Sequence, residues 1–163
     1  MRKVYHGSTE VISNPLVHVG RENLDFGKGF YVTDIQKQAK TWAEIKSRYQ
    51  MVAEGIINEY QFDFDNAIKE YRYKKFEKYD KKWLHFIVDS RDGKKVWHDY
   101  DIIEGGVAND RVIDTVEAYK AGQISEEIAL RELAKHQPNN QICFLKQAVV
   151  DKYLKFRKSV TTK

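Results

Sequence analysis

The sequence predicts one α+β domain, and three observations support this prediction. The chain has 163 residues, enough for one domain with a sizeable core. Hydrophobic residues make up 42% and charged residues 32% of the sequence, a composition typical of globular rather than disordered proteins. Short stretches with the pattern of strands are scattered among helical stretches, without repeats, linkers or low-complexity segments. We therefore expect a single domain spanning residues 1–163.

The first part of the chain predicts two short strands separated by a long loop. VYHGS has the pattern of a strand that ends in a turn, and FYVT has the pattern of a second strand. Between them, residues 8–29 are polar and are interrupted by Pro15, Gly20, Gly27 and Gly29. A loop of this length in a compact domain is usually functional or mobile.

Helical and strand patterns then alternate. Thr33 and Gln36 have the spacing of a capping box, which predicts a helix with Thr33 as its N-cap. Residues 56–64 alternate as a strand with one solvated side, and residues 66–88 return to helical spacing.

The last part predicts a strand, two helices, a further strand and a closing helix. WHDYDIIEGGVA has a strand pattern that breaks at the glycine pair 105–106, and residues 110–121 form a helix that stops near Gly122. Ser125 is placed to cap a helix that runs to residue 135. QICFL then predicts a strand, and KQAVVDKYLKFRKS predicts a basic helix at the end.

Charge and cysteine content restrict the class of protein. A net charge of +4 and a pI of about 9.0 allow an anionic ligand or nucleic acid, or simply a solvated surface rich in lysine. Cys143 is the only cysteine, which excludes an intramolecular disulfide, and its apolar neighbours predict burial. The N-terminal MRKVYHGS lacks the apolar core of a signal peptide, and no apolar run approaches the roughly 18 residues of a membrane helix. We expect a cytoplasmic protein without membrane contact.

Three local features can carry chemistry. The run Gly27-Lys28-Gly29 leads into a strand rather than a helix and lacks the Ser or Thr of a Walker loop, so it is not a phosphate loop. Its glycines serve either close approach of a ligand beside Tyr31 or a strained turn. His6 can hydrogen-bond a ligand hydroxyl or a backbone carbonyl. Gln141, which opens the late strand, can donate and accept, or can simply finish a turn.

Metal and nucleic-acid binding have weaker support. The five histidines are scattered and none has a partner at ligand spacing, so we expect no metal site. Residues 69–83 combine lysines with aromatic side chains that could stack on bases. Their spacing near 3.6 residues is also that of a stripe facing the core.

The order of these features resembles the ADP-ribosyltransferase superfamily. YHGS with His6 resembles its first motif, and GKGFYVT with Tyr31 resembles its second, close to the Gly-x-Gly-Ile-Tyr-Phe of poly-ADP-ribose polymerases. NQICF places Gln141 where the third motif has its usual glutamate. Over nearly its full length the chain also resembles a bacterial family of unknown function within that superfamily, through YHGS, LDFGKGFYVT with QA..WA, DYDIIEGGVANDRV and NNQICF.

This resemblance implies a split antiparallel β-sandwich flanked by helices, with NAD bound as a substrate between two facing sheets. It implies that His6 contacts a ribose hydroxyl, that the Gly7 backbone holds the nicotinamide amide, and that Tyr31 stacks on the nicotinamide ring. It implies that the glycine turn makes room for NAD and that the side chains of Arg21 and Lys28 face its diphosphate. The further NAD-binding positions are Ser8, Arg21, Gly27, Lys28, Gly29 and Phe30.

Gln141 is a departure from the pattern of the superfamily. The glutamate holds the ribose 2'-hydroxyl and stabilises the positive charge of an oxocarbenium-like state, whereas an amide can do only the first and cannot act as a general base. We therefore expect another carboxylate to contribute to NAD binding and catalysis, and Asp110 in VANDRV is the first candidate.

The expected function is transfer of ADP-ribose from NAD to a protein or nucleic acid, a pentosyl-transfer (glycosyltransferase) reaction. The resemblance further implies a component of a toxin–antitoxin or conflict system with a small antitoxin-like partner protein. One alternative is a catalytically inactive domain that binds NAD, another nucleotide or a protein. Another is a nucleic-acid-binding protein that uses residues 69–83 and whose affinity falls steeply with salt.

Overall fold

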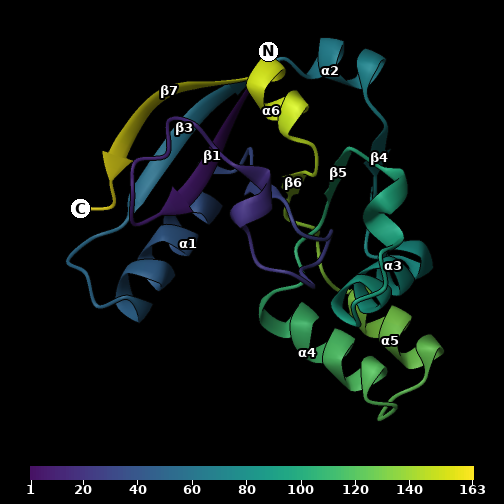
Figure 1. Ribbon diagram of the computed structural model, residues 1–163. Helices are drawn as coiled ribbons and strands as arrows, with labels where there is room; N and C mark the ends of the chain where they lie inside the picture. Colours follow the sequence, from purple (N-terminus) through teal and green to yellow (C-terminus); the bar gives the residue numbers. More distant parts are fainter.

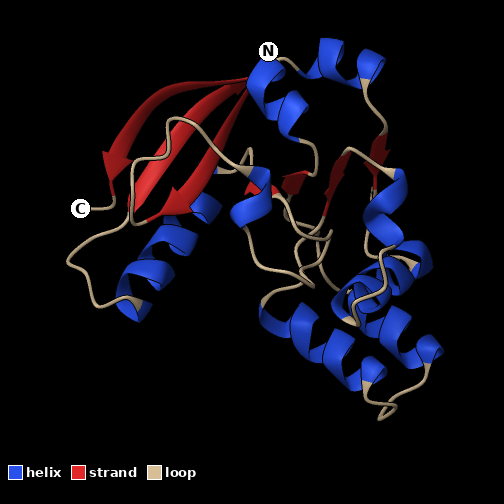
Figure 2. Ribbon diagram, in the orientation of Figure 1, coloured by secondary structure: helices blue, strands red, loops and turns tan.

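The molecule is built on two β-sheets in the computed structural model, which describes residues 1–109 and 111–163 (Figures 1 and 2). Within these residues, seven strands and six α-helices confirm the predicted α+β class. Most strand pairs are antiparallel. None of the helices in these two ranges is long and apolar enough to cross a membrane.

The first sheet is antiparallel and carries a helix on one face. Its strands, in order, are β1 (Arg2–Ser8), β3 (Ile56–Phe62) and β7 (Leu154–Thr161). Helix α1 (Gln36–Tyr49) packs on this sheet through Ala39 and Ala43, which contact Tyr5 and Ile57 in one buried cluster. The small side chains on α1 let the helix lie close to β1.

In the described part of the chain, one isolated bridge links the backbones of the two sheets. Its strands, in order, are β2 (Phe30–Val32), β6 (Gln141–Phe144), β5 (Ile102–Gly105) and β4 (Tyr73–Lys75). Only β4, which pairs with β5, is parallel to its neighbour. The Tyr5 N–H donates to the Thr33 carbonyl over 2.8 Å and the Thr33 N–H donates to the Tyr5 carbonyl over 2.9 Å. This bridge ties β1 to the end of β2.

Apolar side chains from both faces of the second sheet form two cores. One core lies where the two sheets meet and contains Val4, Tyr60, Phe62 and Phe144. The other surrounds the fully buried Trp83 and is covered by three helices that Figure 1 shows gathered at one end of the molecule. These are α3 (Lys81–Arg91), α4 (Asp110–Lys120) and α5 (Glu126–Leu133). Two short helices, α2 (Phe64–Glu70) and α6 (Gln147–Tyr153), lie at the opposite end.

The structure confirms several predicted elements. The strand predicted over residues 56–64 is β3, the helix predicted over 110–121 is α4, and QICF is β6. Ser125 caps α5, because its hydroxyl accepts the Ile128 N–H over 3.2 Å. The strand predicted over WHDYDIIEGGVA is confined to β5, with a 3₁₀ turn at Val96–Asp99 before it.

The capping box at Thr33 was a wrong prediction. Helix α1 begins at Gln36, with Ile35 as N-cap, two residues after the predicted cap. The reason is the bridge to Tyr5: the carbonyl of an N-cap accepts the first hydrogen bond of its helix, whereas the Thr33 carbonyl accepts the Tyr5 N–H. The Thr33 hydroxyl instead accepts the Ile35 N–H over 3.0 Å.

Two predicted helices are only partly helical, because strand pairing overrides local spacing in the rest of each segment. Residues 66–88 divide into α2, β4 and α3, since β4 pairs with β5. The aromatic side chains of that segment still reach the core, so Phe76, Tyr79 and Trp83 are buried rather than open to bases. The closing helix ends at Tyr153, and the chain continues as β7 along β3.

Candidate functional site

His6 on β1 and Tyr31 on β2 are joined at the junction of the two sheets. The His6 Nδ1–H donates to the Tyr31 carbonyl oxygen over 2.6 Å, and the His6 ring stacks on Phe30 with centroids 4.5 Å apart. Because a carbonyl oxygen only accepts, the neutral ring carries its proton on Nδ1 and leaves Nε2 as an acceptor. Burial lowers the pKa of His6 to about 4, and nearby Lys46 acts in the same direction. At neutral pH His6 therefore presents an acceptor.

The backbone of Gly7 lies at a strand edge that opens just beyond this junction. Among the described residues, the Tyr5–Thr33 bridge is the only ladder pair between β1 and β2. Alternate residues of a strand direct their N–H and C=O to the same edge, so those of Gly7 face the side of β2, as those of Tyr5 do. A Cβ at Gly7 would lie 2.1 Å from the Ala39 carbonyl oxygen of α1, so only glycine fits there. The open edge therefore offers the Gly7 N–H as a donor next to the Gly7 C=O as an acceptor.

The side chain of Tyr31 closes the glycine turn that precedes it. Its hydroxyl donates to the Gly27 carbonyl over 2.5 Å and accepts the Phe26 N–H over 3.1 Å. Burial raises the pKa of Tyr31 well above its ordinary value, so the hydroxyl keeps its proton. Neighbouring residues of a strand point to opposite faces, so the Tyr31 ring lies on the other face of β2 from Phe30.

Packing within the protein accounts for the glycines of this turn. Gly27 has a φ of +95°, and a Cβ there would lie 2.5 Å from the ring of Trp97. At Gly29 a Cβ would lie 2.5 Å from the carbonyl oxygen of Phe144. The positive φ and the contact favour the strained-turn alternative at Gly27, and close packing alone accounts for Gly29.

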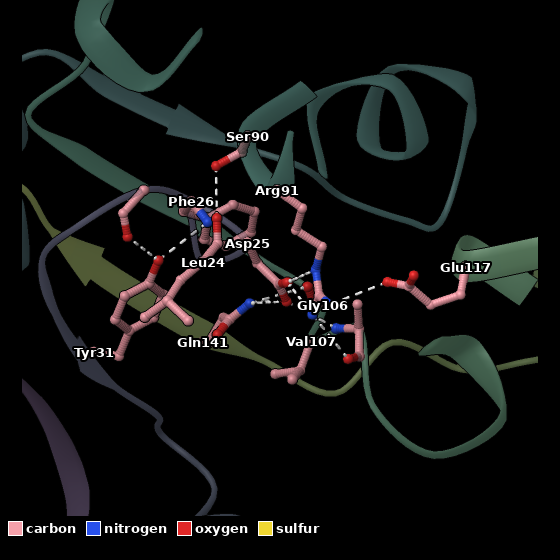
Figure 3. Close-up of polar contacts among 12 residues, drawn as sticks. Leu24, Asp25, Phe26, Tyr31, Ser90, Arg91, Gly106, Val107, Glu117 and Gln141 are labelled. Carbon is pink, nitrogen blue, oxygen red and sulfur yellow. Dashed lines mark hydrogen bonds and ion pairs between the residues drawn. The ribbon is translucent and has the colours of Figure 1, made fainter. Parts of the chain in front are cut away.

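Gln141 belongs to a buried polar network centred on Asp25 (Figure 3). The Gln141 Nε2–H₂ donates to Asp25 Oδ2 over 3.1 Å and to the Gly106 carbonyl over 3.4 Å. The same Asp25 oxygen accepts the Ala108 N–H over 3.0 Å. Its other oxygen lies 2.8 Å from Arg91 Nε and 2.6 Å from Arg91 Nη2. Three segments distant in sequence thus hold one carboxylate beside the amide.

Three further predicted positions are Ser8, Arg21 and Lys28. Ser8 is buried and its hydroxyl accepts from Lys46 Nζ over 3.5 Å. Arg21 is exposed, and Lys28 Nζ lies 3.9 Å from Glu22. Asp110, the predicted compensating carboxylate, lies outside the described residues.

Glu104 is a second buried carboxylate beside β6, and it joins four segments. Its oxygens accept from Arg2 over 3.0 and 2.7 Å, from the Tyr73 hydroxyl over 2.5 Å and from Asn140 Nδ2 over 2.7 Å. Burial alone would raise the pKa of Glu104, but hydrogen bonds from Arg2, Tyr73 and Asn140 outweigh it and lower the pKa to about 2. The network fixes Asn140, the residue immediately before Gln141.

Sequence reasoning missed Asp25, Arg91 and Glu104. Asp25 stands within the LDFGKGFYVT run and Glu104 interrupts the apolar run IIEGG, so both were visible as unusual carboxylates. Arg91 gave no signal, because its contact with Asp25 joins positions 66 residues apart.

A cavity of about 300 Å³ is lined by residues that include Arg111, His136 and Asn139. Asn139 precedes Gln141 by two residues, and its side-chain oxygen accepts the Val107 N–H over 3.1 Å. Over the described ranges, no group of three His, Cys, Asp or Glu side chains could hold a metal ion.

The chain matches one family model over residues 2–156, that of DUF3990, described as a protein of unknown function. Neither the curated proteins nor the solved structures contain a match.

Proposed function

The chain belongs to the DUF3990 family, and we propose that it is an NAD-dependent ADP-ribosyltransferase that acts on a macromolecule. The observation that carries the proposal is the meeting of β1, β2 and β6. These strands bring His6, Tyr31 and Gln141 to one region. The three residues follow one another along the chain in the same order as the three motifs of the superfamily that they resemble. In this proposal the two sheets form the split sandwich of that superfamily.

The open edge of β1 supports recognition of the nicotinamide group. A carboxamide carries one acceptor oxygen and an NH₂ donor, which is the complement of a backbone N–H next to a C=O. The Gly7 backbone offers this pair beside the junction. His6 Nε2 is an acceptor in the neutral tautomer, which suits a ribose hydroxyl.

The proposed reaction is a substitution at the ribose carbon that bears nicotinamide. The bond to the nicotinamide nitrogen breaks and its electron pair leaves with neutral nicotinamide, while a nucleophile of the acceptor forms the new bond and releases a proton. The transition state carries positive charge on the ribose, which a nearby fixed anion stabilises. Gln141 supplies an amide for the ribose 2'-hydroxyl, and Asp25 lies directly behind it.

A second candidate function is an inactive domain that binds NAD or another nucleotide. The observation that favours it is the neutral, 4% exposed side chain of Gln141, which cannot act as a general base. Under this alternative the protein binds NAD and releases no nicotinamide. The proposed partners are a macromolecular acceptor and a small antitoxin-like protein. Transfer to the acceptor also separates the two candidates, since only the enzyme attaches ADP-ribose to it.

Calorimetric titration with NAD, together with an assay of nicotinamide release, tests the proposal. Tyr31→Ala removes the ring proposed to stack on nicotinamide, and we expect it to lose measurable NAD binding. Tyr49→Ala makes the same change at a side chain that is 88% exposed, and should bind as the unmodified chain does. Unchanged affinity in a folded Tyr31→Ala variant would count against the pocket.

A further inference from the structure

The orientation of the Gln141 amide is fixed by its neighbours. The side-chain nitrogen faces a carboxylate oxygen of Asp25 and the carbonyl oxygen of Gly106, both of which only accept hydrogen bonds. The NH₂ group must therefore point at them, and a flipped amide would place Oε1 against two acceptors. Figure 3 shows Oε1 directed away from Asp25. The Gln141 side chain thus presents an acceptor oxygen on its other side.

Asp25 is itself held in place by donors on both of its oxygens. Arg91 binds one oxygen through two nitrogens, and the Ala108 N–H and the Gln141 NH₂ group donate to the other. A buried carboxylate with this set of donors is fixed in position. The exposed fraction of Asp25 is 6%, so solvent does little to weaken these contacts.

We propose that Asp25 is a positioning residue that, through its hydrogen bond with the Gln141 NH₂ group, turns the Gln141 carbonyl oxygen toward the substrate. This inference rests on the proposed function. The amide oxygen then accepts the ribose 2'-hydroxyl, and the hydrogen bond from the NH₂ group to Asp25 holds that oxygen in place.

The arrangement also predicts that glutamate at position 141 disturbs the site. In Gln141→Glu, two carboxylates would stand where nitrogen and oxygen are now 3.1 Å apart. Like charges at this distance favour protonation of one of them, so the pKa of the new carboxyl rises. The other titratable or charged groups near the pair are Arg91, Glu117, Tyr31 and Cys143. Replacing Asp25 by Asn in the same chain removes the repulsion.

The test uses four proteins: the unmodified chain, Asp25→Asn, Gln141→Glu and the double variant. Thermal unfolding from pH 5 to pH 8 needs no NAD and tests the pairing alone. A carboxyl whose pKa is raised in the folded state makes the protein less stable as pH rises from its unfolded pKa to its folded pKa. The Tm of Gln141→Glu should therefore fall by about 5 °C from pH 5 to pH 8. The double variant should lose much less. Gln123→Glu, at an exposed glutamine, is the matched control.

Nicotinamide release by the same proteins tests the role in the reaction. Asp25→Asn should lower kcat about a hundredfold with less than about a threefold change in the Kd for NAD. The reason is that it loosens the Gln141 amide, whose contact with the ribose matters most in the transition state. Asp89→Asn makes the same substitution at a partly exposed position on α3, and its kcat should not change.

The outcomes separate the pairing from the proposed reaction. Equal pH profiles of Tm for Gln141→Glu and the double variant would show that the two side chains do not face each other, and would overturn the inference. Full kcat in Asp25→Asn, with NAD turnover by the unmodified chain, would overturn the positioning role but leave the proposed function standing. No NAD binding or turnover by any of the proteins would overturn the proposed function and this inference with it.

Discussion

Replacement of Glu104 by glutamine should destabilise the protein in a way that depends on pH. Glu104 is 2% exposed and accepts hydrogen bonds from Arg2, Tyr73 and Asn140. A pKa lowered from 4.5 to about 2 in the folded state corresponds to about 3 kcal/mol of stability at pH 7. Glu104→Gln keeps the shape of the side chain but removes its charge, so we expect a loss of this order.

The sign of the pH dependence follows from the lowered pKa. A carboxyl with a depressed folded pKa contributes stability above its unfolded pKa and loses it as pH falls through the folded value. For Glu104 this window runs from about pH 5 down to about pH 2. The difference in free energy of unfolding between the unmodified chain and Glu104→Gln should therefore shrink by about 2 kcal/mol from pH 7 to pH 3.

Urea unfolding of both proteins at pH 7, 5, 4 and 3 measures this difference. Glu70→Gln serves as the control, because Glu70 pairs with Lys152 at the surface, where the pair adds little. Equal stability of Glu104→Gln and the unmodified chain at pH 7 would contradict this expectation. A difference that stays constant down to pH 3 would do so too, since Glu104 would then not be the group that titrates.

Three further predictions concern the junction and the turn. Gly27→Ala should lower the free energy of unfolding by about 2–4 kcal/mol, because it combines a positive φ with contact against Trp97. Gly122→Ala has a positive φ in open space and should lower it by about 1 kcal/mol. Tm measurements compare the two variants, and equal losses would contradict the role of packing at Gly27. Tyr31→Phe should lower the free energy of unfolding by about 1–3 kcal/mol through the lost hydroxyl bonds, yet change the Kd for NAD by less than about fivefold because the ring remains. The pKa of His6 is lowered to about 4, so the unmodified chain should lose stability as pH falls from 6.5 to 4. In urea titrations His6→Gln should lose less stability over this range. Identical pH profiles for the two proteins would show that His6 is not buried in its neutral form.

The sequence predicted elements where a local signal and the tertiary structure agree. The strands around His6, Tyr31 and Gln141, the cap at Ser125 and the end of α4 near Gly122 all have such signals, and all are present. The glycines of the GKG turn were also visible, and the structure adds that Gly27 packs against Trp97.

Elements that depend on a distant partner could not be predicted in this way. The segment 66–88 has helical spacing, but its middle pairs with β5 as β4, and α6 gives way to β7 along β3. At the candidate site, Gln141 was a predicted residue, but its link to Asp25 joins residues 116 positions apart. Spacing patterns report neighbours within one element and carry no information about such contacts.

Transfer of label from NAD to a macromolecule is the most direct test of the central claim. Purified protein is incubated with NAD labelled in its adenylate phosphate and a bacterial lysate, and the products are separated after treatment with protease or nuclease. We expect a labelled band that one of the two treatments removes, protease for a protein acceptor and nuclease for a nucleic acid, and that is absent with Tyr31→Ala. Binding of NAD with neither labelled product nor nicotinamide release would contradict the account and favour the inactive NAD-binding domain.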